Sequence, residues 1–167
     1  MLSPDEPILL LTTGGTIDKI YFDALSDYQV GETVVAHLLE LGRVKRPFRI
    51  DEVTRKDSLE LTDADRAAIR ERALSAPEAH IVITHGTDTM TETAKVLADI
   101  PGKTIVLVGA LAPARFGESD ASFNLGMAFA AAQLAQPGVY ITMSGSVFRA
   151  DRVLKDRAQG AFVAMGG

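Results

Sequence analysis

Two short segments of the chain place threonine hydroxyls directly after apolar runs. Residues 12–17 read Thr-Thr-Gly-Gly-Thr-Ile, and residues 84–89 read Thr-His-Gly-Thr-Asp-Thr. Each apolar run has the character of a β-strand, so each hydroxyl-bearing segment stands where a strand is expected to end. In an open α/β sheet, ligands bind in the crevice beyond the carboxyl ends of the strands. We therefore expect the two segments to converge on one small polar molecule.

Thr16 is the candidate nucleophile of the first segment. The two residues before it, Gly14 and Gly15, allow a backbone with positive φ and a close approach to a ligand. A threonine hydroxyl attacks poorly unless a base or a nearby positive charge helps to remove its proton. A turn in which the glycines serve geometry and the threonine satisfies a backbone group explains the same residues. The segment lacks the spacing of a phosphate-binding loop, so a nucleophile and a structural turn are the two interpretations.

The second segment combines a hydroxyl, a carboxylate and an imidazole. Thr87 offers the hydroxyl, and Asp88 carries a charge able to hold a substrate ammonium group. Helix capping by Asp88 and Thr89 explains part of this pattern, and His85 fits a strand-end residue whose hydrogen bonds are satisfied inside the protein. Capping does not explain the His-Gly-Thr run before the helix. A binding role for Thr87 and Asp88 is therefore the hypothesis to test.

Composition and charge indicate a soluble globular protein. The 167 residues are 47% hydrophobic and 23% charged, with a mean hydropathy of +0.13, so no membrane-spanning segment is expected. The net charge of -5 comes from interspersed charges without a basic run, which argues against nucleic acid as a partner. The chain has no cysteine, which excludes disulfides, a thiolate nucleophile and cysteine metal sites. We expect one domain over residues 1–167.

Neither an export signal nor a metal site is indicated. Residues 1–7 contain two acidic residues and no basic one, and the apolar run of residues 8–11 is too short for the core of a signal peptide. We therefore expect a cytoplasmic protein. The other histidines have no metal-ligand spacing with His85 and Asp88, so we expect no metal and no other cofactor.

Apolar runs alternate with amphipathic segments along the chain. Uniformly apolar runs are typical of strands covered on both faces, and the helical stripes between them need a sheet to cover. This alternation predicts the α/β class, with an open parallel sheet, flavodoxin-like or Rossmann-like, flanked by helices in a single domain. The expected strands are residues 8–11, 81–84, 104–108 and 139–143, with residues 48–53 as an extra edge strand; the expected helices are residues 31–41, a segment that starts at Thr62, residues 89–98 and residues 119–134.

Capping patterns predict the starts of two helices. Thr62 with Asp65, and Thr89 with Glu92, have the spacing of a capping box. The last helix, residues 119–134, is rich in alanine and other apolar side chains. We therefore expect it to be buried over much of its circumference.

Together the two motifs resemble the signatures of the bacterial-type L-asparaginases, a family of threonine-nucleophile amidohydrolases. Thr-Gly-Gly-Thr-Ile follows the first expected strand, and Thr-His-Gly-Thr-Asp-Thr-Met-x-Glu-Thr follows a later one. The resemblance spans nearly the whole chain but covers only the N-terminal domain of the family, so the chain matches a short form. Further matches are residues 27–31 (Asp-Tyr-Gln-Val-Gly), 56–58 (Lys-Asp-Ser), 108–110 (Val-Gly-Ala) with Pro113, 123–125 (Phe-Asn-Leu) and 153–155 (Val-Leu-Lys).

The resemblance implies roles for residues of the first half of the chain. Thr16 would be the primary nucleophile, and Tyr28 would be the tyrosine of a flexible loop that helps to activate it. Tyr21 lies in the same stretch and is the alternative to Tyr28. Ser58 would bind the α-carboxylate of the substrate, and Gly15 would line the same substrate pocket.

The resemblance also implies a second triad of Thr87, Asp88 and Lys155. The lysine ammonium would lower the cost of deprotonating a threonine or a water molecule, and Asp88 would bind the substrate amine. Thr87 would also contact the substrate, because its backbone N–H would stabilise the charge that forms on the carbonyl oxygen. The alternative for Lys155 is a solvated basic stretch, since it stands among Arg149, Arg152 and Arg157.

The activity implied by the resemblance is hydrolysis of L-asparagine to L-aspartate and ammonia through an acyl-threonine intermediate. Two departures bear on substrate binding. Nothing in the chain matches the C-terminal domain that completes a neighbouring site in the family, and Leu59 stands where many relatives have a polar residue. A binding module for a small amino acid, with poor turnover, is the alternative.

We also expect a homo-oligomer, most simply a two-fold dimer, because another copy would close the open side of the site.

Overall fold

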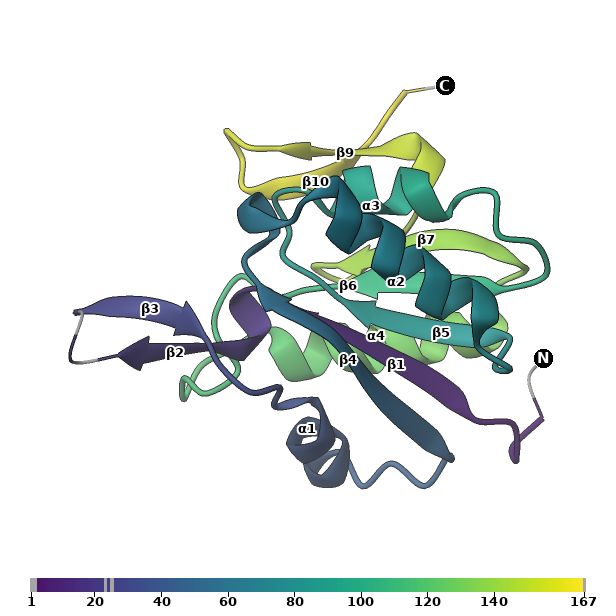
Figure 1. Ribbon diagram of the computed structural model, residues 1–167, viewed down its shortest axis with the longest axis horizontal. Coiled ribbons are helices and arrows are strands. Elements are labelled where there is room, and N and C mark those ends of the chain that lie inside the picture. The colour runs from purple at the N-terminus through teal and green to yellow at the C-terminus, as the bar shows by residue number, and fades with distance from the viewer. Residues whose placement is uncertain (1–2, 23, 25, 167) are drawn as a thin grey trace.

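The apolar runs of the sequence form the centre of one sheet. The computed structural model describes residues 3–22, 24 and 26–166, and its main sheet has the strand order β4-β1-β5-β6-β7-β8 (Figure 1). All neighbours are parallel except β7 and β8, which form an antiparallel pair at one edge. The α/β class and the extra edge strand β4 are therefore confirmed. The strands are β1 (Ile8–Gly14), β4 (Phe48–Lys56), β5 (His80–Thr84), β6 (Thr104–Val108), β7 (Gly138–Met143) and β8 (Ser146–Arg149).

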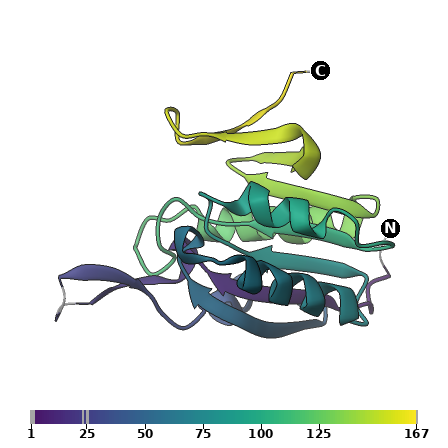
Figure 2. The same ribbon diagram turned by 45° about the horizontal axis from the view of Figure 1, so that its top comes forward.

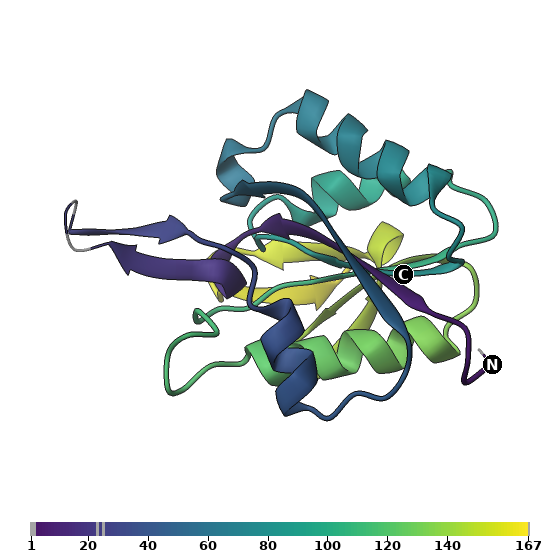
Figure 3. The ribbon, with the colours of Figure 1, turned by 60° about the horizontal axis from the view of Figure 1, so that its bottom comes forward.

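Helices cover both faces of this sheet. Helices α1 (Val35–Leu41) and α4 (Ala121–Leu134) lie on one face, and α2 (Asp63–Ser75) and α3 (Met90–Leu97) lie on the other (Figure 3). Side chains of β1 alternate between two clusters, with Leu10 packed toward α1 and α4 and Leu9 packed toward α2 and α3. Burial on both faces explains why the central strands are uniformly apolar.

Two hairpins lie outside the main sheet. Strands β2 (Lys19–Phe22) and β3 (Asp27–Val30) pair antiparallel and project from the body of the protein beyond the carboxyl end of β1 (Figure 1). Strands β9 (Val153–Asp156) and β10 (Ala161–Ala164) form the second hairpin on the α3 side (Figure 2). Neither hairpin is among the expected strands. The strand β3 is mostly exposed, and β9 and β10 are short and only partly buried.

The first helix begins four residues later than expected. The sequence pattern predicts a start at Gly31, but α1 starts at Val35. The N–H of Gly31 donates to the carbonyl of Asp18 at 2.9 Å, and the N–H of Val34 donates to the Asp18 carboxylate at 2.9 Å. These contacts hold residues 31–34 in a non-helical path.

Helix α4 is buried on one side only, so burial covers less of its circumference than expected. Leu125 and Phe129 are buried against the sheet, but Phe123 is 63% exposed and Leu134 is 64% exposed. No helix within the described part of the chain is long and apolar enough to cross a membrane.

One of the two capping boxes is confirmed. The hydroxyl of Thr62 accepts from the N–H of Asp65, and the Asp65 carboxylate accepts from the N–H of Thr62 at 2.8 Å. Thr89 stands at the start of α3, but its side chain makes no capping hydrogen bond. Its hydroxyl donates instead to the carbonyl of Ser58 at 2.8 Å. The second capping prediction is wrong because a tertiary contact takes the hydroxyl.

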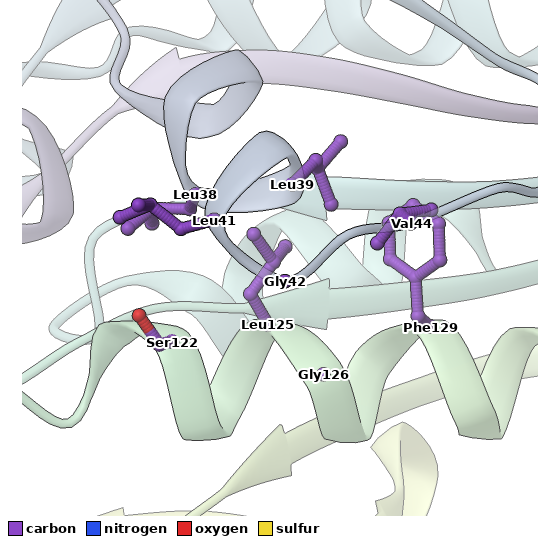
Figure 4. A pocket seen from close by; sticks show the side chains of 9 residues that line it. All are labelled: Leu38, Leu39, Leu41, Gly42, Val44, Ser122, Leu125, Gly126 and Phe129. Atoms are coloured by element: carbon purple, nitrogen blue, oxygen red, sulfur yellow. The ribbon is translucent and has the colours of Figure 1, made fainter.

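An apolar pocket lies between α1 and α4, on the face of the molecule rather than at the motif segments (Figure 4). None of the motif residues lines it. Its lining residues are Leu38, Leu39, Leu41, Gly42, Val44, Ser122, Leu125, Gly126 and Phe129.

Replacing Thr62 by alanine tests the capping box of α2. We expect Thr62→Ala to lower the free energy of unfolding by about 1 kcal/mol, because the backbone N–H of Asp65 loses its acceptor. Ser75→Ala, at the other end of the same helix, serves as the control and should change it by less than about 0.5 kcal/mol. Urea denaturation followed by circular dichroism gives both values. Equal losses for the two variants would contradict the capping role.

Candidate active site

The two threonine motifs meet at their glycines. Strands β1 and β5 are neighbours in the sheet, with Thr12 paired to Thr84, so the two motif segments leave the sheet side by side. A β-carbon placed on Gly15 would lie 2.5 Å from the backbone nitrogen of Gly86, closer than real β-carbons approach. Gly15 also has a φ of 84°, which disfavours any residue with a side chain. The structure thus brings the two motifs together as expected.

Thr16 follows Gly15 in the chain and is partly exposed at the carboxyl end of β1. It is the first residue of a short 3-10 helix, Thr16–Asp18. Ile17, next in the chain, is fully buried and anchors this turn. Because Thr16 is partly exposed, a ligand at this end of the sheet can reach its hydroxyl.

Ser58 is the third element of the site. A β-carbon placed on Gly86 would lie 2.7 Å from the Ser58 hydroxyl oxygen, so the serine lies against the second motif. The side chain is 1% exposed, and its hydroxyl has no hydrogen-bond partner among the described residues. A buried hydroxyl without a partner costs free energy, which a bound ligand can recover. Leu59, the next residue, is 66% exposed.

Thr87, Asp88 and Lys155 form a compact constellation. The ammonium of Lys155 donates to the Thr87 hydroxyl at 2.7 Å and to an Asp88 carboxylate oxygen at 2.6 Å. Lys155 lies on β9, and its side chain is 14% exposed, compared with 61% for Arg149 nearby. Lys155 is thus not part of a solvated basic stretch. The positive charge next to the Thr87 hydroxyl favours removal of its proton.

Tyr28 and Tyr21 lie on the β2–β3 hairpin, away from this constellation. Both rings are about half exposed, with their centroids 5.4 Å apart, and Phe116 lies 5.9 Å from Tyr28. No hydrogen bond joins either tyrosine hydroxyl to Thr16 within the described residues. The structure brings Thr16, Ser58, Thr87, Asp88 and Lys155 to one region but does not bring Tyr28 to Thr16.

His85 is a buried structural residue, as one interpretation of the motif expects. Its Nδ1 lies 2.7 Å from the carbonyl of Gly86, and its Nε2 lies 2.7 Å from the Thr93 hydroxyl. Because a carbonyl only accepts, Nδ1 carries the proton and Nε2 accepts from Thr93. Burial lowers the pKa of His85 to about 4, so the ring is neutral at pH 7. Within the described residues, no cluster of three or more histidine or acidic side chains could hold a metal ion.

An ion pair that the sequence does not reveal ties the nucleophile turn to Ser58. Lys19 lies 2.7 Å from the carboxylate of Asp57, which also accepts from the N–H of Leu59. Burial alone would raise the pKa of Asp57, but the hydrogen bond from Lys19 and its charge hold it below its ordinary value. No local pattern marks Lys19 and Asp57 as partners, because they stand far apart in the sequence and only the fold brings them together.

Comparisons with known proteins identify the family of this chain. Residues 7–164 match the family model described as "Asparaginase, N-terminal". The chain is 38% identical over 137 residues to a glutamyl-tRNA(Gln) amidotransferase subunit of Pyrobaculum aerophilum, covering 75% of this chain and 31% of that protein. It is 29% identical over 167 residues to L-asparaginase of Thermococcus kodakarensis, covering 92% of this chain and 48% of that protein.

Solved structures show the same fold. The thermostable L-asparaginase from Thermococcus kodakarensis superposes with a TM-score of 0.82 at 28% identity, over 95% of this chain and 51% of that one. The probable cytoplasmic L-asparaginase from Campylobacter jejuni gives a TM-score of 0.80 at 27% identity, over 96% and 53%. The chain thus spans about half the length of these proteins. It belongs to the asparaginase family, and the part of the family that it matches is the N-terminal domain.

Proposed function

We propose that this chain hydrolyses the side-chain amide of L-asparagine, with Thr16 as the nucleophile. The observation that carries the proposal is the constellation of Thr87, Asp88 and Lys155, joined by hydrogen bonds of 2.6 and 2.7 Å beside the turn that bears Thr16. Family membership supports an amidohydrolase, and the name of the relative from Thermococcus kodakarensis supports asparagine as the substrate.

The reaction proceeds through an ester on Thr16. The Thr16 hydroxyl oxygen attacks the amide carbon of the substrate while its proton passes to the departing amine. The carbon–nitrogen bond breaks and ammonia leaves. A water molecule then attacks the aspartyl ester, its proton returns to Thr16, and L-aspartate is released. Lys155 and Thr87 support the proton transfers, because the ammonium stabilises an oxygen that loses its proton.

Charge on the carbonyl oxygen needs a fixed donor in the site. The backbone N–H of Thr87 has no acceptor among the described residues. It lies in the segment whose path His85 and Gly86 fix. Such a preorganised N–H stabilises the oxyanion more in the transition state than in the bound substrate. We therefore assign the oxyanion contact to Thr87.

Groups around Thr16 and Thr87 bind the substrate in the proposed reaction. Ser58, whose buried hydroxyl has no partner among the described residues, binds the α-carboxylate, and Gly15 lets the substrate approach the backbone. The Asp88 carboxylate binds the amine. Tyr28 assists Thr16 only if the β2–β3 hairpin moves toward the site, so its role requires motion of that hairpin.

We also propose a homo-oligomer and a cytoplasmic location. A second copy of the chain would close the open side of the site, and the exposed side chains of Phe123 and Leu134 on α4 offer apolar surface for association. The name of the relative from Campylobacter jejuni supports a cytoplasmic location. All proposed roles fall to protein groups, so the reaction as proposed uses no cofactor.

A second candidate function follows from the name of another relative. The relative from Pyrobaculum aerophilum is named as part of an amidotransferase, and it is 38% identical over 137 residues. This observation favours an amidohydrolase domain that provides ammonia within a larger assembly. Ammonia release from free L-asparagine by the purified chain supports the first candidate. Release that requires a partner protein would favour the second, and tight asparagine binding without release would indicate a binding module.

Removing the Thr16 hydroxyl tests the nucleophile. We expect Thr16→Ala to lower kcat for ammonia release by about 1,000-fold or more, because the attacking oxygen is lost. The fold should be unchanged, since Thr16 is partly exposed at the strand end. Coupled measurement of ammonia gives kcat, and circular dichroism checks the fold. A folded Thr16→Ala variant with near-normal release would show that another group attacks.

Removing the ammonium tests the second triad. We expect Lys155→Met to lower kcat by about 100-fold, because Thr87 loses the charge that favours its deprotonation. The matched control is Lys95→Met on the exposed face of α3, which should retain wild-type kcat. If Lys155→Met and Lys95→Met behaved alike, Lys155 would have no part in the chemistry.

Comparison of two amides tests the substrate register. Ser58 and Asp88 anchor the α-carboxylate and the amine, so only one side-chain length places the amide carbon at Thr16. One methylene is worth roughly 1–3 kcal/mol in a fitted pocket, and we expect kcat/KM to favour L-asparagine over L-glutamine by at least about tenfold. Steady-state kinetics with both amides gives the ratio. Equal kcat/KM values would be incompatible with this register.

A further inference from the structure

Asp18 is a buried carboxylate for which the proposed mechanism has no use. It stands two residues after Thr16, ends the 3-10 helix Thr16–Asp18, and is 1% exposed. A buried carboxylate is costly unless its oxygens accept hydrogen bonds. The partners of Asp18 therefore indicate what this residue does.

Those partners lie at the base of the β2–β3 hairpin. The chain enters the hairpin directly after Asp18 and returns at Gly31. The carbonyl of Asp18 accepts from the N–H of Gly31 at 2.9 Å, and its carboxylate accepts from the N–H of Val34 at 2.9 Å. Asp18 thus holds the outgoing chain to the returning chain through both its backbone carbonyl and its side chain.

The loop before α4 also contacts the base of the hairpin. Arg115 donates to the carbonyl of Asp18 at 3.0 Å and to the carbonyl of Glu32 at 2.7 Å. The N–H of Ala114 donates to the carbonyl of Ile17 at 3.1 Å. Phe116 packs against Tyr28. The loop therefore contacts both the nucleophile turn and the hairpin, and Asp18 accepts from Arg115, Gly31 and Val34.

We propose that Asp18 is a positioning residue whose ionised carboxylate couples the turn of Thr16 to the hairpin that carries Tyr28. The inference rests on the proposed function for its effect on catalysis, but the coupling itself is a property of the fold. Loss of the carboxylate charge weakens the hydrogen bond to Val34, because bonds to ionised acceptors are about twice as strong as neutral ones. The hairpin base then loosens while the sheet and its core keep their packing.

The surroundings of Asp18 make this coupling depend on pH. Burial raises the pKa of Asp18 to about 6, although the N–H of Val34, the hydroxyl of Thr33 and the charge of Arg115 oppose the increase. The other charged groups that face it are Glu52, which raises the pKa further, and Arg55, both on β4. The carboxylate is therefore ionised at pH 7 to 8 and protonated below about pH 6.

Ionisation of the Asp18 carboxylate has opposite effects on stability and on activity. The folded protein binds the Asp18 proton more tightly than the unfolded chain, since the pKa rises from 3.8 to about 6 on folding. Its ionisation therefore lowers the free energy of unfolding as the pH rises from 3.8 to about 6. A neutral amide at this position should be at least as stable at pH 8, whereas the coupling to the hairpin is weakened. A merely structural role would make the variant less stable.

The test compares Asp18→Asn with Asp99→Asn, a matched variant of an exposed carboxylate that pairs with Arg70 on α2. We expect Asp18→Asn to lower kcat for asparagine at pH 8 about tenfold with little change in KM, and to unfold at the same or a higher urea concentration. The wild-type kcat should fall below about pH 6, and Asp18→Asn should lose this limb. Asp99→Asn should match the wild type. Wild-type kcat and pH dependence in Asp18→Asn, or a loss of kcat that follows a loss of stability, would overturn the proposal.

Hydrogen exchange separates this inference from the proposed function. If the wild-type protein releases no ammonia, the proposed function fails, but the coupling can still be measured. We expect the amides of Gly31, Val34 and the β2–β3 hairpin to exchange faster in Asp18→Asn than in the wild type at the same pH, while the amides of β5 and β6 do not change. Equal exchange at the hairpin base in the two proteins would overturn the coupling.

Discussion

The close approach of the backbones at Gly15 and Gly86 is the constraint on which the rest of the site depends. Parallel pairing of β1 and β5 brings the two strand ends together, but only residues without a side chain let the two turns touch. Ser58, in the turn that follows β4, then lies against Gly86. Three segments far apart in the sequence thus meet beyond the carboxyl ends of β1 and β5.

Polar contacts hold these three segments in place. Lys19 with Asp57 secures the turn of Ser58, and the Thr89 hydroxyl holds the Ser58 carbonyl. Lys155 reaches Thr87 and Asp88 from the β9–β10 hairpin, which is therefore as much a part of the site as the sheet is. These contacts leave the Ser58 hydroxyl without a partner among the described residues. A site of this kind is preorganised, since its groups need little rearrangement to meet a polar ligand.

The sequence predicts the fold well where burial on both faces dictates the residues. The apolar runs that become β1, β5, β6 and β7 have one compatible environment, the centre of a sheet. The β2–β3 and β9–β10 hairpins are too exposed or too short to leave such a pattern, so they are not predicted. The late start of α1 and the diversion of the Thr89 hydroxyl have a common cause. In both, a distant residue, Asp18 or Ser58, competes successfully with local helix signals.

The candidate site residues also divide into those that a local sequence pattern marks and those whose position depends on the fold. Thr16, Thr87 and Asp88 are marked by motifs at strand ends, which sequence patterns reveal. Lys155 stands in a basic stretch, and only its resemblance to the family motif distinguishes it before the structure shows its partners. The position of Tyr28 relative to Thr16 depends on the placement of a hairpin, which the sequence does not determine.

In the proposed reaction, an ester forms on Thr16 during turnover. Mass spectrometry of protein quenched in acid during the reaction with L-asparagine tests it most directly, because acid preserves the ester and peptide fragmentation locates it. We expect an added aspartyl group on the peptide that contains Thr16, at Thr16 itself. An aspartyl group on Thr87 or on any other residue would contradict it.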